Sequence, residues 1–384
     1  MNIGRLIQQP SGYKAFVPDK FPSDQPIILN SKTQHLHDRA VLMLGKLDGI
    51  TQLLPDLDFF ILMYITKEAA RSSGIEGTKA TIVDVIKSEA DIEYKLPQDV
   101  ERILHYIQAM EYGLKRLETF PLFLRFIREI HQVLIQGTAD APGKTPGEFR
   151  VSQNWIGGGS PNTAWFVPPP PSEIIRCLDD LEKFIYSENI YPPLIKAALV
   201  HAQFETIHPF LDGNGRTGRL LTTLYLCKIG ILERPVLYLS DYFLNNQQAY
   251  YDLLDEYHSE SGNVSAWLDF FLDGAAIIAD EAIKTSKKIN ILRQKDVAKI
   301  QMLGRRAKTG ITVLENLYKL PIVSVRKIEQ WTGLSRPQAN ELVNKFIEIG
   351  ILVQKDKDIE YGREFWYKDY LSLFVSKEEE KENH

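Results

Sequence analysis

The run His208-Pro209-Phe210-Leu211-Asp212-Gly213-Asn214-Gly215-Arg216-Thr217-Gly218-Arg219-Leu220 decides how the rest of the chain is interpreted. It places a titratable base, a carboxylate, three glycines, an asparagine and two arginines in one short span. An apolar run over 220–226 follows at once, which predicts a loop that leads into a helix. The free N–H groups and the positive dipole end of such a helix form a site for an anion.

The side chains of this run add the groups that phosphate chemistry needs. Asp212 can hold a hard cation such as Mg²⁺. Arg216 and Arg219 share one face of a helix, so both can bind phosphate oxygens. His208, with an ordinary pKa of ~6.5, is unprotonated for half or more of the time at neutral pH. A base, a metal ligand, an anion cradle and two guanidinium groups together indicate phosphate transfer.

A turn without chemistry is the plain alternative, because Asp-Gly-Asn-Gly is also a turn signal. A Walker A loop does not fit, since no Lys follows the last Gly, and a dinucleotide fingerprint does not fit, since no strand-like segment precedes the run. The combination of groups, rather than any one of them, favours the phosphate site.

The same run matches the signature HPFxDGNGRxxR at every fixed position, and in this the chain resembles the Fic/DOC family. Members typically transfer the AMP part of ATP to a hydroxyl side chain of a target protein. The resemblance implies that His208 is the catalytic base, that Asp212 binds Mg²⁺, and that Phe210 anchors the loop in the core. The ATP-binding residues that it implies here are His208, Asp212, Gly213, Asn214, Gly215, Arg216, Thr217, Gly218 and Arg219.

A second motif lies well ahead of this run, from Ser72 to Gly77. By itself it indicates the end of a helix over 59–76, with Glu76 in solvent and Gly77 as the stop. The segment is also similar to the inhibitory motif [S/T]xxxE[G/N] of Fic proteins, in the class II-like position before the core. That resemblance implies that Ser72 and Glu76 act with Arg219, that Glu76 reaches into the ATP site, and that the resulting bidentate pair restrains the enzyme.

Two further segments are assigned to ATP binding by the resemblance. Strand-like pieces over 149–156 and 164–167 surround a glycine-rich turn and predict a β-hairpin, whose edge could hold an extended peptide. In the family this hairpin is the flap over the site, and the residues expected along the nucleotide are Asn154, Trp155, Ile156 and Gly157. The adenine and ribose are expected at Asn246 and Tyr250, then Asn245 and Tyr251, although neighbours on one helix cannot all face the nucleotide.

Hydrophobic periodicity predicts a mainly α protein, and the resemblance implies an all-helical Fic core with a small β-hairpin flap. Further helices are expected over 35–54, 81–94, 100–117, 122–135, 172–186 and 194–206, and an apolar, aromatic segment over 264–278 is expected to close the core. Three helical patterns followed by two short strands predict a winged helix-turn-helix near the C-terminus. The predicted domains are an N-terminal helical regulatory domain over 1–118, the catalytic core over 119–278, a connecting helix over 279–306, the winged helix over 307–376 and a charged tail over 377–384.

Composition places the chain among ordinary globular proteins. The 384 residues are 44% hydrophobic and 25% charged, with a net charge of −5, which gives no global reason to expect nucleic-acid binding. With two cysteines, Cys177 and Cys227, a disulfide framework is not expected. No apolar leader or membrane-spanning stretch is recognised, so a cytoplasmic protein without a membrane partner is expected.

The function predicted from these patterns is that of a protein adenylyltransferase, which uses ATP and Mg²⁺, modifies a Ser, Thr or Tyr hydroxyl, and is autoinhibited by Glu76. Two alternatives stay open: removal of AMP at the same site, and a DNA-binding regulator with a ligand-sensing Fic site. The partners expected are a protein substrate along the flap, the chain itself, a second copy in a homodimer, and DNA. DNA contacts are left open because the module is mixed in charge around its candidate reading residues, Arg336, Gln338, Asn340 and Asn344.

Overall fold

The chain divides into two compact units, which a computed structural model describes at residues 3–21, 27–52, 57–90, 97, 99–187, 191–259, 262–356 and 362–375. The first unit contains residues 1–48, 71–77 and 104–280, and the second contains residues 49–70, 78–103 and 281–384. Each unit is therefore built from segments that lie far apart in the sequence.

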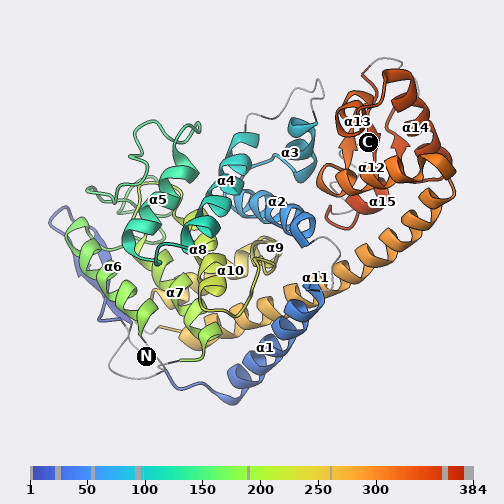
Figure 1. Ribbon diagram of the computed structural model, residues 1–384. Helices are drawn as coiled ribbons and strands as arrows, with labels where there is room; N and C mark the ends of the chain where they lie inside the picture. Colours follow the sequence, from blue (N-terminus) through green and yellow to red (C-terminus); the bar gives the residue numbers. More distant parts are fainter. Residues whose placement is uncertain are drawn as a thin grey trace. The chain divides into compact units, whose positions relative to one another are not determined.

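The first unit is a bundle of helices around α7 (Figure 1). Its helices are α5 (Leu124–Ile135), α6 (Pro171–Tyr186), α7 (Pro193–Ile207), α8 (Asn214–Lys228), α9 (Ser240–Asn245) and α10 (Gln247–Tyr257), with parts of α1 (Ser31–Thr51), α2 (Leu57–Ile75), α4 (Val100–Leu117) and α11 (Val264–Gln301). Helix α7 is buried on every side from Leu194 to Ile207, so it is the central helix and packs against α6, α8 and α10. The mainly α fold predicted from the sequence is confirmed.

The N-terminal segment forms a two-stranded antiparallel hairpin. Strands β1 (Gly4–Gln8) and β2 (Lys14–Pro18) pair with Gly4 opposite Pro18. Phe16 is buried, and its N–H donates to the carbonyl of Val167 at 2.9 Å. The hairpin is thus attached to the last residue of the predicted flap.

The predicted flap strands over 149–156 and 164–167 are reduced to one antiparallel bridge, between Ile156 and Phe166. The first piece does not extend as a strand, because the N–H of Arg150 donates to the carbonyl of Pro209 at 2.9 Å instead of to a neighbouring strand. Gly157 and Gly158 adopt φ of 69° and 67°, which turns the chain directly after the bridge.

The second unit contains the C-terminal elements in the order expected from the sequence. They are α12 (Ala307–Lys319), α13 (Val325–Thr332), α14 (Arg336–Glu348), β4 (Val353–Gln354), β5 (Phe365–Trp366) and α15 (Lys368–Leu371), preceded by the 3₁₀ turn η1 (Gly304–Arg306). A short strand that was not predicted, β3 (Ile322–Val323), joins them in a sheet of order β3-β5-β4. Helix α3 (Ile82–Glu89) also belongs to this unit and starts with a capping box between Thr81 and Asp84.

Helix α11 is continuous across the boundary that was predicted between the core and the connecting helix. The predicted tail over 377–384 and residues 91–94 of one predicted helix lie outside the described residues. In the part of the chain that the structure describes, no helix is both long enough and apolar enough to cross a bilayer.

Candidate functional site

His208 is the residue at which α7 ends. Its N–H donates to the carbonyl of Phe204 at 3.0 Å, and its backbone is left-handed, with φ 49° and ψ 59°. In the described chain Thr145 is the one other non-glycine residue with positive φ. Such a conformation costs about 1–3 kcal/mol and persists where the surroundings impose it.

Arg150 is the main group that imposes this conformation. Its guanidinium is 2% exposed and donates only to carbonyl oxygens in the contacts observed: Nε to His208 at 2.8 Å, Nη2 to Pro169 at 2.6 Å and Ile207 at 3.4 Å, and Nη1 to Ser152 at 3.2 Å. Burial lowers the pKa of Arg150 to about 10. The guanidinium therefore binds the last carbonyls of α7, where the helix dipole is negative.

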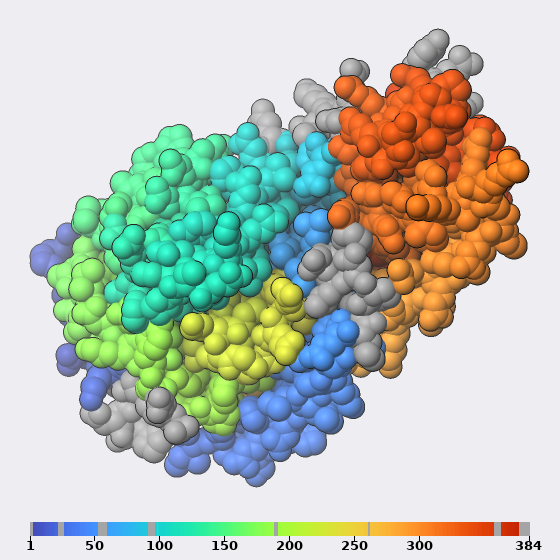
Figure 2. All heavy atoms as spheres, in the orientation of Figure 1, coloured from blue at the N-terminus to red at the C-terminus, as the bar shows by residue number. Residues whose placement is uncertain are grey.

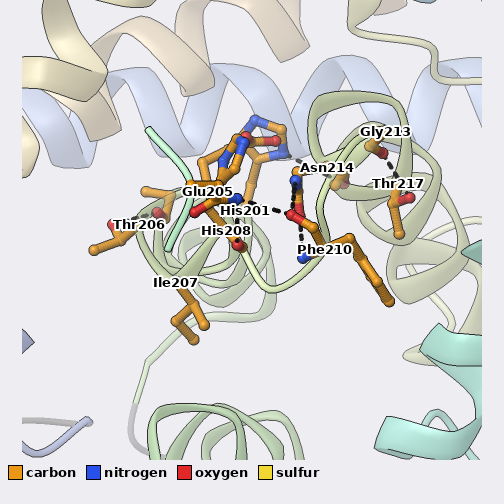
Figure 3. Close-up of polar contacts among 12 residues, drawn as sticks. His201, Glu205, Thr206, Ile207, His208, Phe210, Gly213, Asn214 and Thr217 are labelled. Atoms are coloured by element: carbon orange, nitrogen blue, oxygen red, sulfur yellow. Dashed lines mark hydrogen bonds and ion pairs between the residues drawn. The ribbon is translucent and has the colours of Figure 1, made fainter. Parts of the chain in front are cut away.

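The loop after His208 is fixed by the side chains of Asn214 and Phe210. Asn214 accepts from the Phe210 N–H at 2.8 Å and donates to its carbonyl at 2.9 Å (Figure 3). The Phe210 ring is fully buried and stacks on His131, with ring centroids 3.7 Å apart, which confirms that Phe210 anchors the loop in the core. Asn154 also donates to the Phe210 carbonyl at 2.8 Å, so this predicted nucleotide residue braces the loop.

His131 connects this loop to the loop that contains Gly147. Its Nδ1 accepts from the N–H of Gly147 at 2.9 Å, so Nε2 carries the proton and donates to the carbonyl of Asp212 at 2.9 Å. Burial lowers the pKa of His131 to about 4, so it stays neutral in this role. Asp212 is thereby held at a defined place before α8.

Helix α8 begins inside the motif, at Asn214, with Gly213 as its left-handed N-cap at φ 73°. The first N–H groups of a helix have no partner within it, so they are available to an anion. Gly215 lies in this first turn. A Cβ on Gly215 would stand 2.3 Å from Oε1 of Glu76, so a carboxylate already lies against the start of α8.

Arg219 holds that carboxylate. Its Nη2 donates to Glu76 Oε1 at 2.7 Å and to the Ser72 carbonyl at 3.0 Å, and its Nε donates to Ser72 Oγ at 2.8 Å. Burial alone would raise the pKa of Glu76, but the charge of Arg219, its hydrogen bond and the charge of Arg216 together outweigh burial, so the pKa of Glu76 is lowered. The pKa of Arg219 is raised in return, so both members of the pair are charged.

Arg216 is buried in the same turn of α8 but has spare donors. Its Nη2 donates to Asp140 Oδ2 at 3.1 Å and lies 3.9 Å from Asp212 Oδ1. The Nε and Nη1 atoms of Arg216 are buried without a hydrogen-bond partner in the described chain. The unpartnered donors of the buried Arg216 guanidinium lie on the same helix start as the free amides of α8. Together these groups favour an anionic ligand.

The Thr217 hydroxyl and the Cα face of Gly218 are engaged in packing, and the assignment of these two residues to ATP binding stays a prediction. The Thr217 hydroxyl is buried and donates to the Gly213 carbonyl at 2.8 Å. Gly218 lies against α7, where a Cβ would stand 2.4 Å from Glu205 Oε1 and 3.1 Å from Phe204 Cδ1. Both residues therefore serve the packing and shape of α8.

The predicted adenine residues lie on α9 and α10, whose surface is exposed in yellow on the face seen in Figure 2. Asn245 and Asn246 are exposed, and Asn246 donates to the Tyr242 carbonyl at 2.9 Å. The buried Tyr250 hydroxyl is within 3.0 Å of His201 Nε2. The polar groups of Asn246 and Tyr250 thus already have protein partners.

Tyr251 has a different partner, the end of α2. Its hydroxyl donates to the Ile75 carbonyl at 3.3 Å, and Nε2 of Gln247 donates to the same oxygen at 2.9 Å. Ile75 precedes Glu76, so two side chains of α10 hold the chain at the residue before the inhibitory carboxylate. Gln247 was not recognised in the sequence.

The three other predicted flap residues lie at the bridge rather than beside the loop. Trp155 is 40% exposed, and Ile156 pairs with Phe166. Gly157 is covered by the Trp165 ring, because a Cβ there would stand 2.6 Å from Trp165 Cδ2. Of the flap residues assigned to ATP, Asn154 alone contacts the loop that carries His208 in the contacts observed.

The electrostatics at His208 favour a neutral base. Burial and the nearby Arg150 charge lower the pKa of His208 to about 4. Glu205, three residues earlier on α7, has a pKa raised to about 7 by burial and by the Glu76 charge. Figure 3 shows the two side chains next to each other, with Glu205 Oε2 3.9 Å from His208 Nδ1.

Asp212 is a suitable single-carboxylate ligand for Mg²⁺. Its side chain is 38% exposed, and Lys144 Nζ lies 3.8 Å from Oδ2. Within the described residues, no group of three or more His, Cys, Asp or Glu side chains could form a protein-only metal site. Mg²⁺ commonly uses one or two carboxylates together with substrate phosphates and waters, so one exposed carboxylate beside an anion cradle fits it.

The sequence matches relatives of one family. A profile of the Fic/DOC family matches residues 121–226, and a profile of the Fic/DOC family N-terminal region matches residues 34–115. The protein adenylyltransferase Fic of Drosophila grimshawi is 32% identical over 165 residues, which are 41% of this chain and 32% of that protein. The Drosophila melanogaster protein of the same name is 30% identical over 165 residues, again 41% and 32% of the two chains. The chain spans about a third of the length of these curated relatives.

Solved structures share the fold. A Fic family protein from Desulfovibrio desulfuricans G20 aligns with a TM-score of 0.59 and 20% identity, over 90% of this chain and 98% of its own. A Fic domain containing signaling protein from Bacteroides thetaiotaomicron VPI-5482 aligns with a TM-score of 0.52 and 20% identity, over 67% and 97%. The signature loop, the helix that it starts and the two profile matches lead to one conclusion: the chain contains a Fic domain of the Fic/DOC family over residues 121–226, preceded by that family's N-terminal region over residues 34–115.

Proposed function

We propose that the protein is an adenylyltransferase that moves AMP from ATP to a Ser, Thr or Tyr hydroxyl of a protein, itself included. The observation that carries this proposal is the start of α8, where free amides and the two unpartnered donors of Arg216 lie beside a neutral His208. The names of the matched relatives support the same reaction class.

The groups of the site have separate roles in this reaction. Nε2 of His208 takes the proton of the target hydroxyl as its oxygen bonds to the α-phosphorus. The bond from the α-phosphorus to the bridging oxygen breaks, and pyrophosphate leaves with that electron pair. The amides of α8 and Arg216 stabilise the charge on the phosphate oxygens. Mg²⁺ held by Asp212 would supply further neutralisation of the phosphates when bound.

Glu76 would restrain this reaction by occupying Arg219. While Glu76 Oε1 accepts from Nη2 at 2.7 Å, that guanidinium cannot bind the terminal phosphate of ATP. The carboxylate also lies over Gly215, so it repels an anion at the start of α8. ATP would then bind in a pose that does not align its α-phosphorus with His208.

Label position tests the reaction type. Three forms of the protein are compared: the parent, Glu76→Gly and Glu76→Gly/His208→Ala. Each is incubated with a protein mixture and with ATP that is labelled at either the α or the γ position. We expect label from the α position to appear on protein. The amount should be larger with Glu76→Gly than with the parent, and no label should appear with Glu76→Gly/His208→Ala. Label from the γ position would indicate phosphoryl transfer, and equal labelling without His208 would exclude the mechanism.

The two other readings of the site give different results in related assays. Removal of AMP predicts that the parent protein releases AMP from a pre-modified target and that Glu76→Gly does not. A DNA-binding regulator predicts a salt-dependent shift of duplex DNA without transfer. A DNA-binding regulator does not account for the neutral base beside an anion cradle, and the assay with a pre-modified target separates AMP removal from AMP transfer at the same site.

A further inference from the structure

Glu205 is a buried carboxylate for which the fold has no structural use. It is 5% exposed in the last turn of α7, in a helix that is buried on all sides. A carboxylate in such a place is costly unless it is paired. In the described chain, Oε1 of Glu205 has no hydrogen-bond partner.

Other buried or half-buried carboxylates of the same unit have clear structural roles. Glu129 accepts from Tyr112, Arg116 and Arg125, and Glu182 accepts from the N–H of Leu124 at the start of α5. Glu205 has no such role, although Arg219 lies on the neighbouring helix, because that guanidinium is bound to Ser72 and Glu76. Burial without a structural partner is typical of a functional group.

The neighbouring helix makes room for this carboxylate. Gly218 of α8 faces it, and any Cβ at that position would stand 2.4 Å from Oε1. On the other side lies Nδ1 of His208, which is itself buried without a hydrogen-bond partner and is 3.9 Å from Oε2. The unsatisfied Nδ1 of His208 thus faces the Glu205 carboxylate at about 1 Å beyond the usual length of a hydrogen bond, and the backbone carbonyl of Glu205 is the other acceptor near this ring.

We propose that Glu205 is a positioning residue for His208, whose Nδ1–H donates to the Glu205 carboxylate so that Nε2 is free to accept the proton of the target hydroxyl. Hydrogen bonds of this kind are often long before substrate binds and shorten in the reacting complex. The inference rests on the proposed function for its chemistry. A base that is oriented by a second group is a recurrent arrangement in enzymes.

The proton balance defines what Glu205 contributes. When Nε2 takes the hydroxyl proton, the imidazole becomes a cation in a buried site. The Glu205 carboxylate then faces that cation and stabilises it, and the proton passes to solvent after pyrophosphate has left. Glu205 itself need not accept the proton.

This role has a pH signature. Burial raises the pKa of Glu205 to about 7 and lowers that of His208 to about 4. Below about pH 7 the protonated carboxyl would donate to Nδ1, and the neutral imidazole would carry its own proton on Nε2, where it cannot act as a base. The charged and titratable groups that face the pair are Arg219, Glu76, Tyr250, Tyr251, His258 and Arg150.

The kinetic test uses the full chain with Glu76→Gly, so that transfer is not restrained. Glu205→Gln is compared with Glu182→Gln, a matched change at a carboxylate outside the site. Glu205→Gln is expected to lower kcat by about 10²-fold with an unchanged KM for ATP, and to remove the fall in rate below pH 7. Glu182→Gln should do neither. An unchanged kcat and pH profile, or an effect confined to KM, would overturn the proposal.

A second measurement does not depend on transfer. The eight histidines are labelled at ¹³Cε1, and the His208 signal is identified by its loss in His208→Ala. The His208 signal should shift with a midpoint near pH 7 in the parent, and this step should be absent in Glu205→Gln. A parent without the step refutes the pairing. If the step behaves as expected but no AMP is transferred, the pairing stands and the proposed function fails.

Discussion

The contact between Glu76 and Arg219 sets how strongly the proposed transferase is restrained. Replacing Glu76 by Gly removes a charge-assisted hydrogen bond of 2.7 Å, a type that contributes about 1.5–3 kcal/mol. The Arg219 side chain is 2% exposed but that of Glu76 is 40% exposed, so solvent places the value near the low end, about 1.5 kcal/mol. Since about 1.4 kcal/mol corresponds to a factor of ten, the rate should rise about tenfold.

Glu76→Gln refines this expectation. It keeps an oxygen that Arg219 can bind but loses the charge, and a neutral hydrogen bond contributes about half as much. The rate should therefore rise by about threefold, between the parent and Glu76→Gly. The assay is the initial rate of α-label transfer at saturating ATP. A Glu76→Gln protein as fast as Glu76→Gly, or a Glu76→Gly protein no faster than the parent, would refute the reasoning.

The restraint should not vary with pH on the alkaline side of neutrality. The pKa of Glu76 is lowered, so its carboxylate is charged and bound above its ordinary range, and the contact is lost only as the pH falls through the lowered value. The ratio of the Glu76→Gly rate to the parent rate should thus be constant between about pH 8 and about pH 9, which lies above the Glu205 pKa of about 7 that the Glu76 charge helps to raise. A ratio that changes across this interval would mean that another group controls the restraint.

Three other substitutions have defined outcomes. Arg150→Met removes the donor to the carbonyls of Ile207 and His208 at the end of α7 and to that of Pro169, at about 1–3 kcal/mol each, so the transfer rate should fall at least tenfold, and Arg150→Lys should recover part of it. Gly218→Ala should lower both the unfolding temperature and the rate, since overpacking costs about 1–3 kcal/mol, whereas Gly45→Ala, with open space around it, should lower neither. Asp212→Asn should raise the Mg²⁺ concentration needed for half-maximal rate, measured by titration, with little change in unfolding temperature.

The arrangement of the loop from His208 to Arg219 could be predicted because its parts are adjacent in the chain. A glycine-rich segment before an apolar run places amides and arginines at one helix start, whatever the rest of the fold. The contact between Glu76 and Arg219 spans 143 positions, and the residues alone favoured a solvated glutamate. The resemblance to the family supplied that pairing, and the structure contains it.

Side-chain direction on α8 could not be predicted, because it depends on how α8 packs against α7. Thr217 and Gly218 fall within the motif, yet one binds a carbonyl of its own helix and the other makes room for a residue of α7. Tyr250 likewise lies in a segment assigned to the nucleotide, but its hydroxyl meets His201 in the core. Sequence spacing places such residues near a site without fixing the direction in which they point.

The roles of Arg150 and Glu205 were not predicted, because both residues lie outside the recognised motifs. Each lies in a stretch that reads as ordinary strand or buried helix, and each matters through a partner that folding brings close. A charged residue inside an otherwise apolar segment was the available signal. That signal marks a position as unusual but does not name its partner.

The restraint by Glu76 depends on the end of a helix, because Gln247 and Tyr251 bind the Ile75 carbonyl at the last residue of α2. The last turn of a helix frays more readily than its middle. Here the inhibitory residue Glu76 directly follows the last turn of α2, so its position depends on the contacts that hold this turn. Unwinding a single turn would withdraw Glu76 while leaving the rest of the bundle folded. An activator of this protein would then need only to capture a loosened helix end, and warming alone should mimic it in part.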